Sequence, residues 1–239
     1  MPESASKPTL SPPKSNGWVA WMYRCPVTFV FLIVYVLAYL TELVVNHSFR
    51  AQTGWFYGHF ALSLPGLQHG WWWQLITYQL MHQGWLHLIF NGWVIFCFGE
   101  GLEPVLGRLR YTLLLLLSGV LGGLLQCLAA GLWPWYFGGG VVGASASAFG
   151  LVAAYAAMFP SFPLELLILY VIPVTISART LLIGSLAVAL VGFGWRIGNV
   201  AHAAHLGGMV AGYLFIRMDW CRWVFGMAKL PVRTELSSP

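Results

Sequence analysis

Long apolar runs alternate with short polar segments along most of this 239-residue chain. A helix that crosses a bilayer needs about 20 mostly apolar residues, and six runs come close to that length. The pattern therefore predicts an all-α, polytopic membrane protein in which six transmembrane helices form a bundle. The predicted spanning helices cover residues 26–45, 82–98, 111–130, 141–159, 178–195 and 201–217.

Several segments between these runs are predicted to be irregular. Residues 46–73 are rich in glycine and aromatic side chains, which is typical of a long loop in the interfacial aromatic belt of a membrane. Residues 99–110 carry several charges and are expected to form a turn. Residues 161–176 are apolar, but Pro163 and Pro173 interrupt them. We therefore interpret this stretch as a loop or interfacial segment.

The two ends of the chain differ from its apolar centre. Residues 1–24 are polar at first and rich in proline and serine, and they are predicted to form a disordered cytoplasmic tail. No cleavable signal peptide is visible, because the apolar run begins only after this polar stretch. We expect the membrane domain to cover residues 25–218 and residues 219–239 to form a cytoplasmic C-terminal tail.

The composition favours a membrane protein and excludes an ordinary soluble domain. Apolar residues make up 59% of the chain and charged residues only 8%, whereas about a quarter of the residues in a soluble domain are charged. The four cysteines are scattered singly, without a CxxC motif. We interpret them as buried free thiols.

The basic residues predict the orientation of the helices. Cytoplasmic segments of membrane proteins carry an excess of lysine and arginine. In a six-helix arrangement, all of the 12 lysines and arginines except Arg50 and Arg196 fall on the side of the two termini. This bias places both termini in the cytoplasm. The formal net charge of +5 is dispersed over helix ends and forms no patch, so no nucleic-acid partner is predicted.

Four polar side chains are predicted to meet near the outer membrane surface. His87 and Asn91 lie near the start of the second helix, four residues apart and hence on one helix face. Ser145 opens the fourth helix, and His205 lies early in the sixth. All three helices run inward, so these groups lie roughly 0–15 Å below the outer surface. Polar groups at such a depth are costly and indicate a functional site.

A serine activated by a histidine, with further donors for an oxyanion, is the minimum set of groups for acyl transfer. A helix start suits the serine, because free N–H groups and the helix dipole stabilise negative charge there. Two other interpretations stand beside this one. The small residues around Ser145 also fit close helix packing, and the seven histidines offer metal ligands. Since no HExxH motif is present and no carboxylates accompany the histidines, we predict neither a metal nor a cofactor.

Three motifs resemble those of the rhomboid intramembrane serine proteases. Members of that family carry HxxxN on the second core helix, GxSG at the start of the fourth and AHxxHLGG on the sixth. This sequence reads HLIFN at residues 87–91, GASA at 143–146 and AHAAHLGG at 201–208. The order of the motifs and their positions on the predicted helices agree with the family over about residues 26–217.

The resemblance implies a role for each polar residue of the pocket. Ser145 would be the nucleophile, and His205 would be the general base that later protonates the leaving amine. His87, Asn91 and the backbone N–H of Ser145 would line the oxyanion hole.

The resemblance also implies supporting positions. Phe149 stands where the family places an aromatic ring on the catalytic imidazole, and Gly208 stands where the sixth helix approaches the fourth. Gly143 matches the family motif, but Ala146 replaces its usual second glycine. Alanine keeps the backbone N–H, so we expect activity to be kept. The loop of residues 46–73 also lacks the Trp-Arg pair that is common in the family.

The function implied by the resemblance is cleavage of transmembrane segments in other membrane proteins. The active site would open to the outer, periplasmic side of a bacterial inner membrane. The expected partners are transmembrane substrates and the lipid bilayer, and the oligomeric state is left open. Two alternatives are a catalytically inactive rhomboid-like protein that binds membrane clients, and a small transporter, which the absence of an inverted repeat disfavours.

Overall fold

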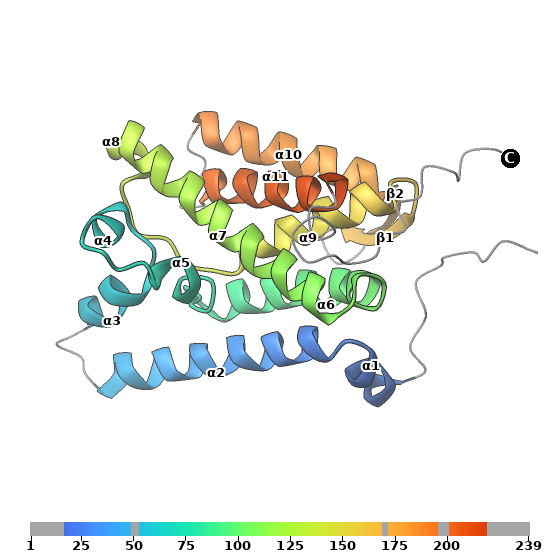
Figure 1. Ribbon diagram of the computed structural model, residues 1–239, viewed down its shortest axis with the longest axis horizontal. Coiled ribbons are helices and arrows are strands. Elements are labelled where there is room, and N and C mark those ends of the chain that lie inside the picture. The colour runs from blue at the N-terminus through green and yellow to red at the C-terminus, as the bar shows by residue number, and fades with distance from the viewer. Residues whose placement is uncertain (1–16, 49–52, 169–171, 196–200, 219–239) are drawn as a thin grey trace, which may run out of the picture.

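The computed structural model describes residues 17–48, 53–168, 172–195 and 201–218 (Figure 1). Helices dominate these ranges, and one two-stranded hairpin accompanies them. In chain order the elements are α1 (Trp18–Arg24), α2 (Pro26–Ser48), α3 (Thr53–Phe60), α4 (Leu64–Gln68), α5 (Gln74–Thr77), α6 (Trp85–Leu106), α7 (Arg108–Leu132), α8 (Pro134–Phe137), α9 (Ser145–Met158), β1 (Pro163–Ile168), β2 (Ile172–Ser177), α10 (Ala178–Trp195) and α11 (His202–Met218).

Within the described residues, four helices are long and apolar enough to cross a membrane, namely α2, α6, α7 and α10. They correspond to the first, second, third and fifth predicted spans. α9 has 14 residues and α11 has 17, which at about 1.5 Å per residue gives lengths of about 21 and 26 Å. The protein is therefore mostly helical with several membrane-spanning candidates, and the count of six spanning helices stays a prediction.

The predicted turn at residues 99–110 is wrong. α6 continues through most of that segment to Leu106, with Pro104 inside the helix, and α7 begins at Arg108. The break falls on Gly107, whose φ of 77° is a left-handed conformation that glycine adopts without strain. A single glycine thus replaces the expected charged turn.

The carboxylate of Glu103 explains why charge is tolerated inside this helix. Glu103 is buried, and its two carboxylate oxygens accept hydrogen bonds of 2.8 Å from the backbone N–H groups of Val27 and Thr28. The Thr28 hydroxyl donates a third bond, of 2.7 Å. Since the first N–H groups of a helix lack partners within that helix, Glu103 serves as a cap for α2.

The prediction of an irregular loop at residues 46–73 is also wrong in part. The described part of this stretch contains α3 and α4. Gln74 ties them together, because its side chain is fully buried, accepts from the N–H of Ser63 and donates to the carbonyl of Gly58. Buried amide hydrogen bonds of this kind give order to a segment that lacks a strong hydrophobic period.

The described part of residues 161–176 contains strand β1 (Pro163–Ile168) and most of strand β2 (Ile172–Ser177), where the sequence predicted a loop or interfacial segment. The strands are antiparallel, and the register pairs Pro163 with Ser177 and Leu167 with Pro173. A strand accommodates proline where the nitrogen faces away from the partner strand. In an antiparallel ladder, hydrogen-bonded pairs alternate with pairs that lack these bonds. Both prolines lie in pairs of the second kind, so neither interrupts the ladder.

The predicted disordered tail at residues 1–24 needs a correction at its end. Residues 18–24 form α1, which packs against the bundle through Trp21. The Trp21 ring lies 4.8 Å from that of Phe96 and 6.3 Å from that of Phe29, measured between centroids. Residues 1–16 of the predicted N-terminal tail, the predicted C-terminal tail and Cys221 lie outside the described residues.

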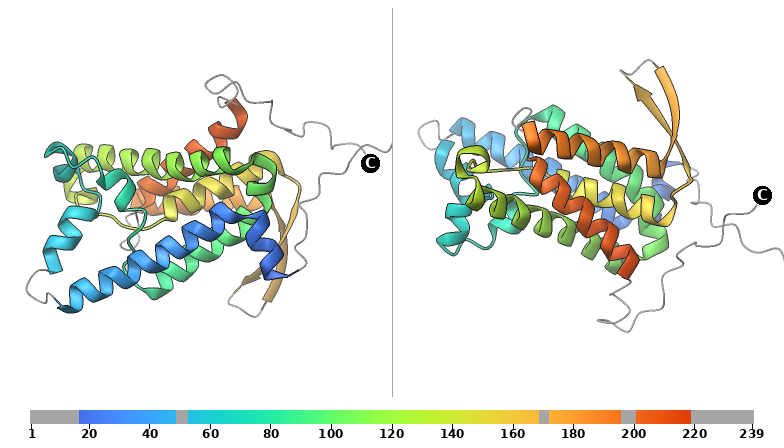
Figure 2. Two further views of the ribbon diagram at one scale, coloured as in Figure 1. Left: turned by 60° about the horizontal axis from the view of Figure 1, so that its bottom comes forward. Right: turned by 90° about the horizontal axis from the view of Figure 1, so that it is seen from above.

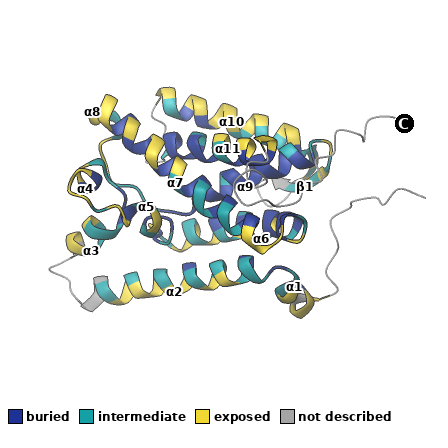
Figure 3. Cartoon of the chain, viewed as in Figure 1, coloured by how far each residue is buried: buried dark blue, intermediate teal, exposed yellow. Residues whose placement is uncertain are grey.

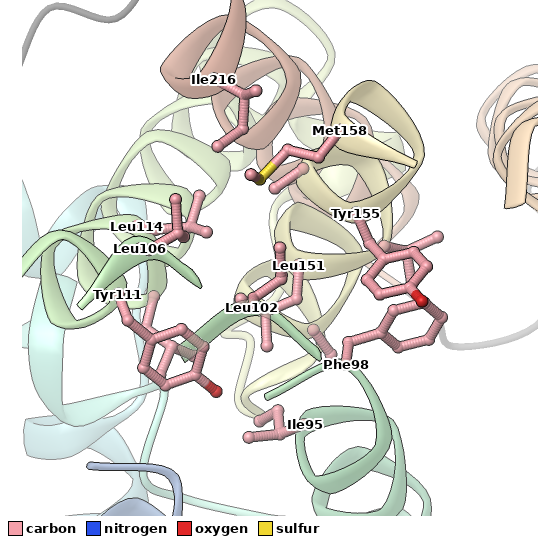
Figure 4. Packing of buried hydrophobic residues seen from close by; sticks show 14 of the residues in the cluster. Ile95, Phe98, Leu102, Leu106, Tyr111, Leu114, Leu151, Tyr155, Met158 and Ile216 are labelled. Atoms are coloured by element: carbon pink, nitrogen blue, oxygen red, sulfur yellow. The ribbon is translucent and has the colours of Figure 1, made fainter. Parts of the chain in front are cut away.

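α9 lies at the centre of the bundle (Figures 1 and 2). It packs against α6, α7, α10 and α11, and almost all of its residues are buried (Figure 3). Leu151 and Tyr155 of α9 join Leu102 of α6 and Leu114 of α7 in the main hydrophobic core (Figure 4). Most other positions of α9 are alanine, serine or glycine, which lets neighbouring backbones approach closely.

Candidate active site

Ser145 is the first residue of α9, and backbone hydrogen bonds fix the turn that precedes it. Gly143 has a φ of 123°, which disfavours any side chain at that position. Its N–H donates a 2.8 Å hydrogen bond to the carbonyl of Tyr78, and Val141 pairs with Leu62 in an isolated β-bridge. The sharp turn sets the start of α9 and so the position of the Ser145 hydroxyl.

His205 of α11 contacts this hydroxyl directly. Its Nε2 lies 2.8 Å from the Oγ of Ser145. With the ring proton on Nδ1, Nε2 accepts the hydroxyl proton, which is the arrangement of a general base with its nucleophile. The His205 side chain is buried, with 8% of its surface exposed, so little water competes for the bond.

The contact depends on the close approach of α9 and α11. A β-carbon at Gly208 would collide with the carbonyl of Ala146, and one at Gly212 would collide with the carbonyl of Gly150. The two helices therefore touch backbone to backbone, and this brings a side chain of α11 within hydrogen-bond reach of the first turn of α9. The expected role of Gly208 agrees with this geometry.

Phe149, one turn after Ser145, lies against the imidazole. The centroids of the Phe149 and His205 rings are 4.5 Å apart, and the planes are tilted by 38°. An aromatic contact of this kind restricts the ring orientation of the histidine. The structure thus places the Phe149 ring beside the imidazole of His205.

His87 and Asn91 of α6 lie on the other side of Ser145, against the turn at Gly143. A β-carbon at Gly143 would lie 2.6 Å from Cε1 of His87 and 3.5 Å from Nδ2 of Asn91. Asn91 is buried, and its Nδ2 has no hydrogen-bond partner among the described residues. Such a donor has an energetic reason to bind an incoming acceptor.

All four polar residues line one cavity of about 650 Å³. Ser145, His205, His87 and Asn91 lie on its wall, and Ser185 of α10 also lines it. The rest of the lining is mainly apolar, as is usual for a binding site with a few placed polar groups.

Ala146, the departure from the family motif, is buried and faces α7. A β-carbon at Gly122 of α7 would lie 2.7 Å from the methyl carbon of Ala146. The methyl group thus occupies space that a glycine on the neighbouring helix leaves free.

Among the polar residues that support the pocket, sequence reasoning gave His82 only a structural role near the start of the second helix, and it missed Gln79 and Ser147. The buried Oγ of Ser147 lies 3.0 Å from Oε1 of Gln79 and 2.8 Å from the carbonyl oxygen of Leu115. His82 is buried beside His87, with ring centroids 5.2 Å apart. The available signal was a glutamine and a histidine just before an apolar run, since buried polar groups in such places need partners.

The comparisons with known proteins agree on one family. Residues 69–222, more than half of the chain, match the Rhomboid domain. Rhomboid protease GluP of Bacillus subtilis (strain 168) is 25% identical over 193 residues, which cover 78% of this chain and 33% of that protein. Rhomboid protein 1, mitochondrial, of Saccharomyces cerevisiae is 31% identical over 134 residues, which cover 56% of this chain and 38% of that protein.

A further relative is YdcA of Bacillus subtilis (strain 168), which also carries the rhomboid name. It is 39% identical over 90 residues, which cover 38% of this chain and 43% of that protein. The matched segments span less than half of each of these relatives. On the strength of the domain match, supported by these relatives and by the apolar helices, this chain belongs to the rhomboid family of integral membrane proteins.

Proposed function

We propose that this protein is an intramembrane serine endopeptidase in which Ser145 is the nucleophile and His205 is the general base. The observation that carries the proposal is the 2.8 Å contact between Nε2 of His205 and Oγ of Ser145. A free serine hydroxyl is a weak nucleophile, and a histidine within hydrogen-bond reach activates it.

The reaction follows from this contact. The Ser145 proton passes to Nε2 of His205 as Oγ attacks the carbonyl carbon of the scissile peptide bond, which forms a tetrahedral intermediate. His205 then donates this proton to the leaving amine, and an acyl-enzyme forms. Water, deprotonated by His205, releases the acyl group and restores Ser145.

Asn91 and His87 support the proposal as oxyanion donors. The charge that develops on the carbonyl oxygen needs donors that are already in place. Asn91 Nδ2 is buried without a partner in the described part of the chain, His87 lies beside it, and the N–H of Ser145 is one of the unpaired groups at the start of α9. Gly143 and Phe149 are proposed to hold these groups and the imidazole in place.

The substrates proposed here are transmembrane segments of other proteins. The cavity is mainly apolar and lies between helices of a membrane bundle, so a peptide that is itself apolar fits it. The bias of lysine and arginine supports cytoplasmic termini and a site near the outer side of the membrane. The inner membrane of a bacterium is the proposed location.

Labelling with a fluorophosphonate probe tests the proposal. The purified wild-type protein in detergent is expected to be labelled, and S145A and H205A are expected to lose the label. Replacement of the exposed Ser161 by alanine is the matched control, because it removes a serine outside the cavity. Absence of labelling in folded wild type would reject the proposal and favour an inactive rhomboid-like protein that binds membrane clients.

A further inference from the structure

The β1–β2 hairpin has a free edge that the reaction described above does not use. Among the described residues the sheet contains only these two strands, so each has one edge without a strand beside it. A free edge presents N–H and C=O groups that readily pair with another extended chain. In an apolar environment such groups have an even stronger need for partners.

The register shows which groups face outward. Every second pair of the ladder belongs to one set. The pairs of this set that contain Pro163 and Pro173 lie on either side of a third pair, which joins Glu165 with Thr175. Because a proline nitrogen faces away from the partner strand, this set does not form the hydrogen bonds between β1 and β2. The backbone N–H and C=O of Glu165 therefore point to the free edge of β1, and those of Thr175 point to the free edge of β2.

The two edges are not equivalent. Pro173 occupies the outward position on β2, and a proline there blocks pairing with a further strand. β1 has its proline only at the first residue, Pro163, so the position of Glu165 is open. The chemistry of the two edges thus favours β1 as the one that accepts a partner.

The cavity of the proposed active site reaches this same edge. Its lining includes Leu164, Glu165 and Leu166, three consecutive residues of β1, and no described residue of β2. Side chains alternate between the two faces of a strand. A cavity against one face would therefore touch every second residue and residues of both strands. Contact with three consecutive residues of one strand places the cavity along the free edge.

We propose that the free edge of β1 binds the substrate by strand addition, in the part of the substrate that runs inward from the scissile bond. The proposal rests on the proposed function, because it takes the cavity to be the path of the substrate. The occupant is a stretch of transmembrane segment that has left the helical conformation. Its backbone pairs with the outward N–H and C=O of Glu165, as in other cases of peptide recognition at sheet edges.

The length of the cavity sets where the pairing begins. Ser145 and Val152 of α9 both line it, and seven residues of helix correspond to about 10 Å. An extended chain covers about 3.3 Å per residue. The cavity therefore accommodates at least about three residues of substrate inward from the scissile bond, and the paired residues lie beyond these, outside the part of the substrate that reacts.

The test removes the outward N–H of Glu165 and measures peptide cleavage. The probe is a fluorophore-labelled single-span peptide that the wild-type protein cleaves in phosphatidylethanolamine–phosphatidylglycerol vesicles. Glu165→Pro removes the N–H at the β1 edge without removing a bond of the hairpin ladder, and cleavage is expected to slow by about fivefold or more. Thr175→Pro is the matched control, because it makes the same change at the opposite edge, and it is expected to cleave within twofold of wild type.

The fluorophosphonate probe separates the two proposals. It is too small to need strand pairing, so E165P and T175P are both expected to be labelled like wild type. Equal cleavage by E165P and wild type, or an equal loss in E165P and T175P, would overturn the strand-addition proposal while labelling upheld the protease. Loss of labelling in wild type itself would reject the protease.

A second measurement leaves the protein unchanged. N-methylation of single backbone nitrogens is scanned along the probe peptide, since a methyl group removes the donor in the same way as proline. Cleavage by wild type is expected to fall at alternate positions that lie about three or more residues inward from the scissile bond. A flat profile across this region would overturn the proposal even if E165P failed to fold.

Discussion

At the scale of single residues, the replacement of the motif glycine by Ala146 has a structural counterpart on the neighbouring helix. The methyl of Ala146 faces Gly122 of α7. Alanine also favours a helix by about 1 kcal/mol over glycine. Alanine at position 146 is therefore compatible with the start of α9, because the facing residue of α7, Gly122, has no side chain.

Replacement of Gly122 tests this pairing. A β-carbon there would lie 2.6 Å from the carbonyl oxygen of Ala204 and 2.7 Å from the methyl carbon of Ala146. G122A is therefore expected to reduce the free energy of unfolding by about 1–3 kcal/mol, which is measured as a lower unfolding temperature in detergent. G131A on the same helix meets only an ordinary contact of 3.5 Å with Leu64. It is expected to be neutral or stabilising, and an equal loss in both variants would contradict the argument.

His82 gives a prediction of pH dependence at the residue scale. It precedes the membrane-spanning part of α6, and burial, assisted by the nearby His87, lowers its pKa from 6.5 to about 4. Between these values the unfolded chain binds more protons than the folded protein, so stability is expected to fall as the pH drops from about 6.5 towards 4.

Thermal unfolding at pH 7 and pH 5 measures this effect. H82Q cannot titrate, so its unfolding temperature is expected to change less between the two pH values than that of wild type. H69Q removes an exposed histidine and is the control for the loss of one imidazole. Identical slopes in wild type and H82Q would show that His82 is not the group responsible.

At the scale of elements, the geometry of the proposed catalytic pair depends on how closely α11 approaches α9. Gly208 and Gly212 of α11 meet the backbone of α9 at Ala146 and Gly150. Interiors are densely packed, so even one added methyl group must move a helix. The serine and histidine come from separate helices, and their distance is therefore a property of the helix pair.

G208A is expected to separate this pair of helices. Its new methyl group meets the carbonyl of Ala146, which is backbone and cannot rotate away. A displacement of about 1 Å between nucleophile and base lowers the rate by about 100-fold, so fluorophosphonate labelling of G208A is expected to slow to that extent. G184A on α10 has open space around its new methyl group and is expected to be labelled at the wild-type rate.

At the scale of the whole molecule, the proposed orientation follows from the charges and the number of spans. Six spans with cytoplasmic termini place the segment between α7 and α9 outside. A C-terminal fusion of green fluorescent protein after residue 239 is expected to fluoresce, and alkaline phosphatase fused after residue 139 is expected to be active. The reverse pattern, or a fluorescent fusion at both sites, would reject the six-span arrangement.

The sequence by itself determined the long apolar helices and nominated four polar residues that line the pocket. The run that forms α10 was predicted with the bounds that the structure has, because hydrophobic length is a local property. The spacing of His87 and Asn91 likewise places both on one face of α6. Helix periodicity and the three motifs were sufficient to nominate Ser145 and His205 before any contact was known.

Only the tertiary structure decided the rest. Considered one at a time, Pro163 and Pro173 predict a loop. The hairpin forms because the register of the two strands places both prolines in pairs that need no hydrogen bond between the strands. The charges of residues 99–110 predict a turn, but Glu103 finds its partners at the start of α2, more than 70 residues away in the chain. The 2.8 Å bond between His205 and Ser145 is likewise a contact between distant segments. Such pairings are set by packing across helices, which no local pattern encodes.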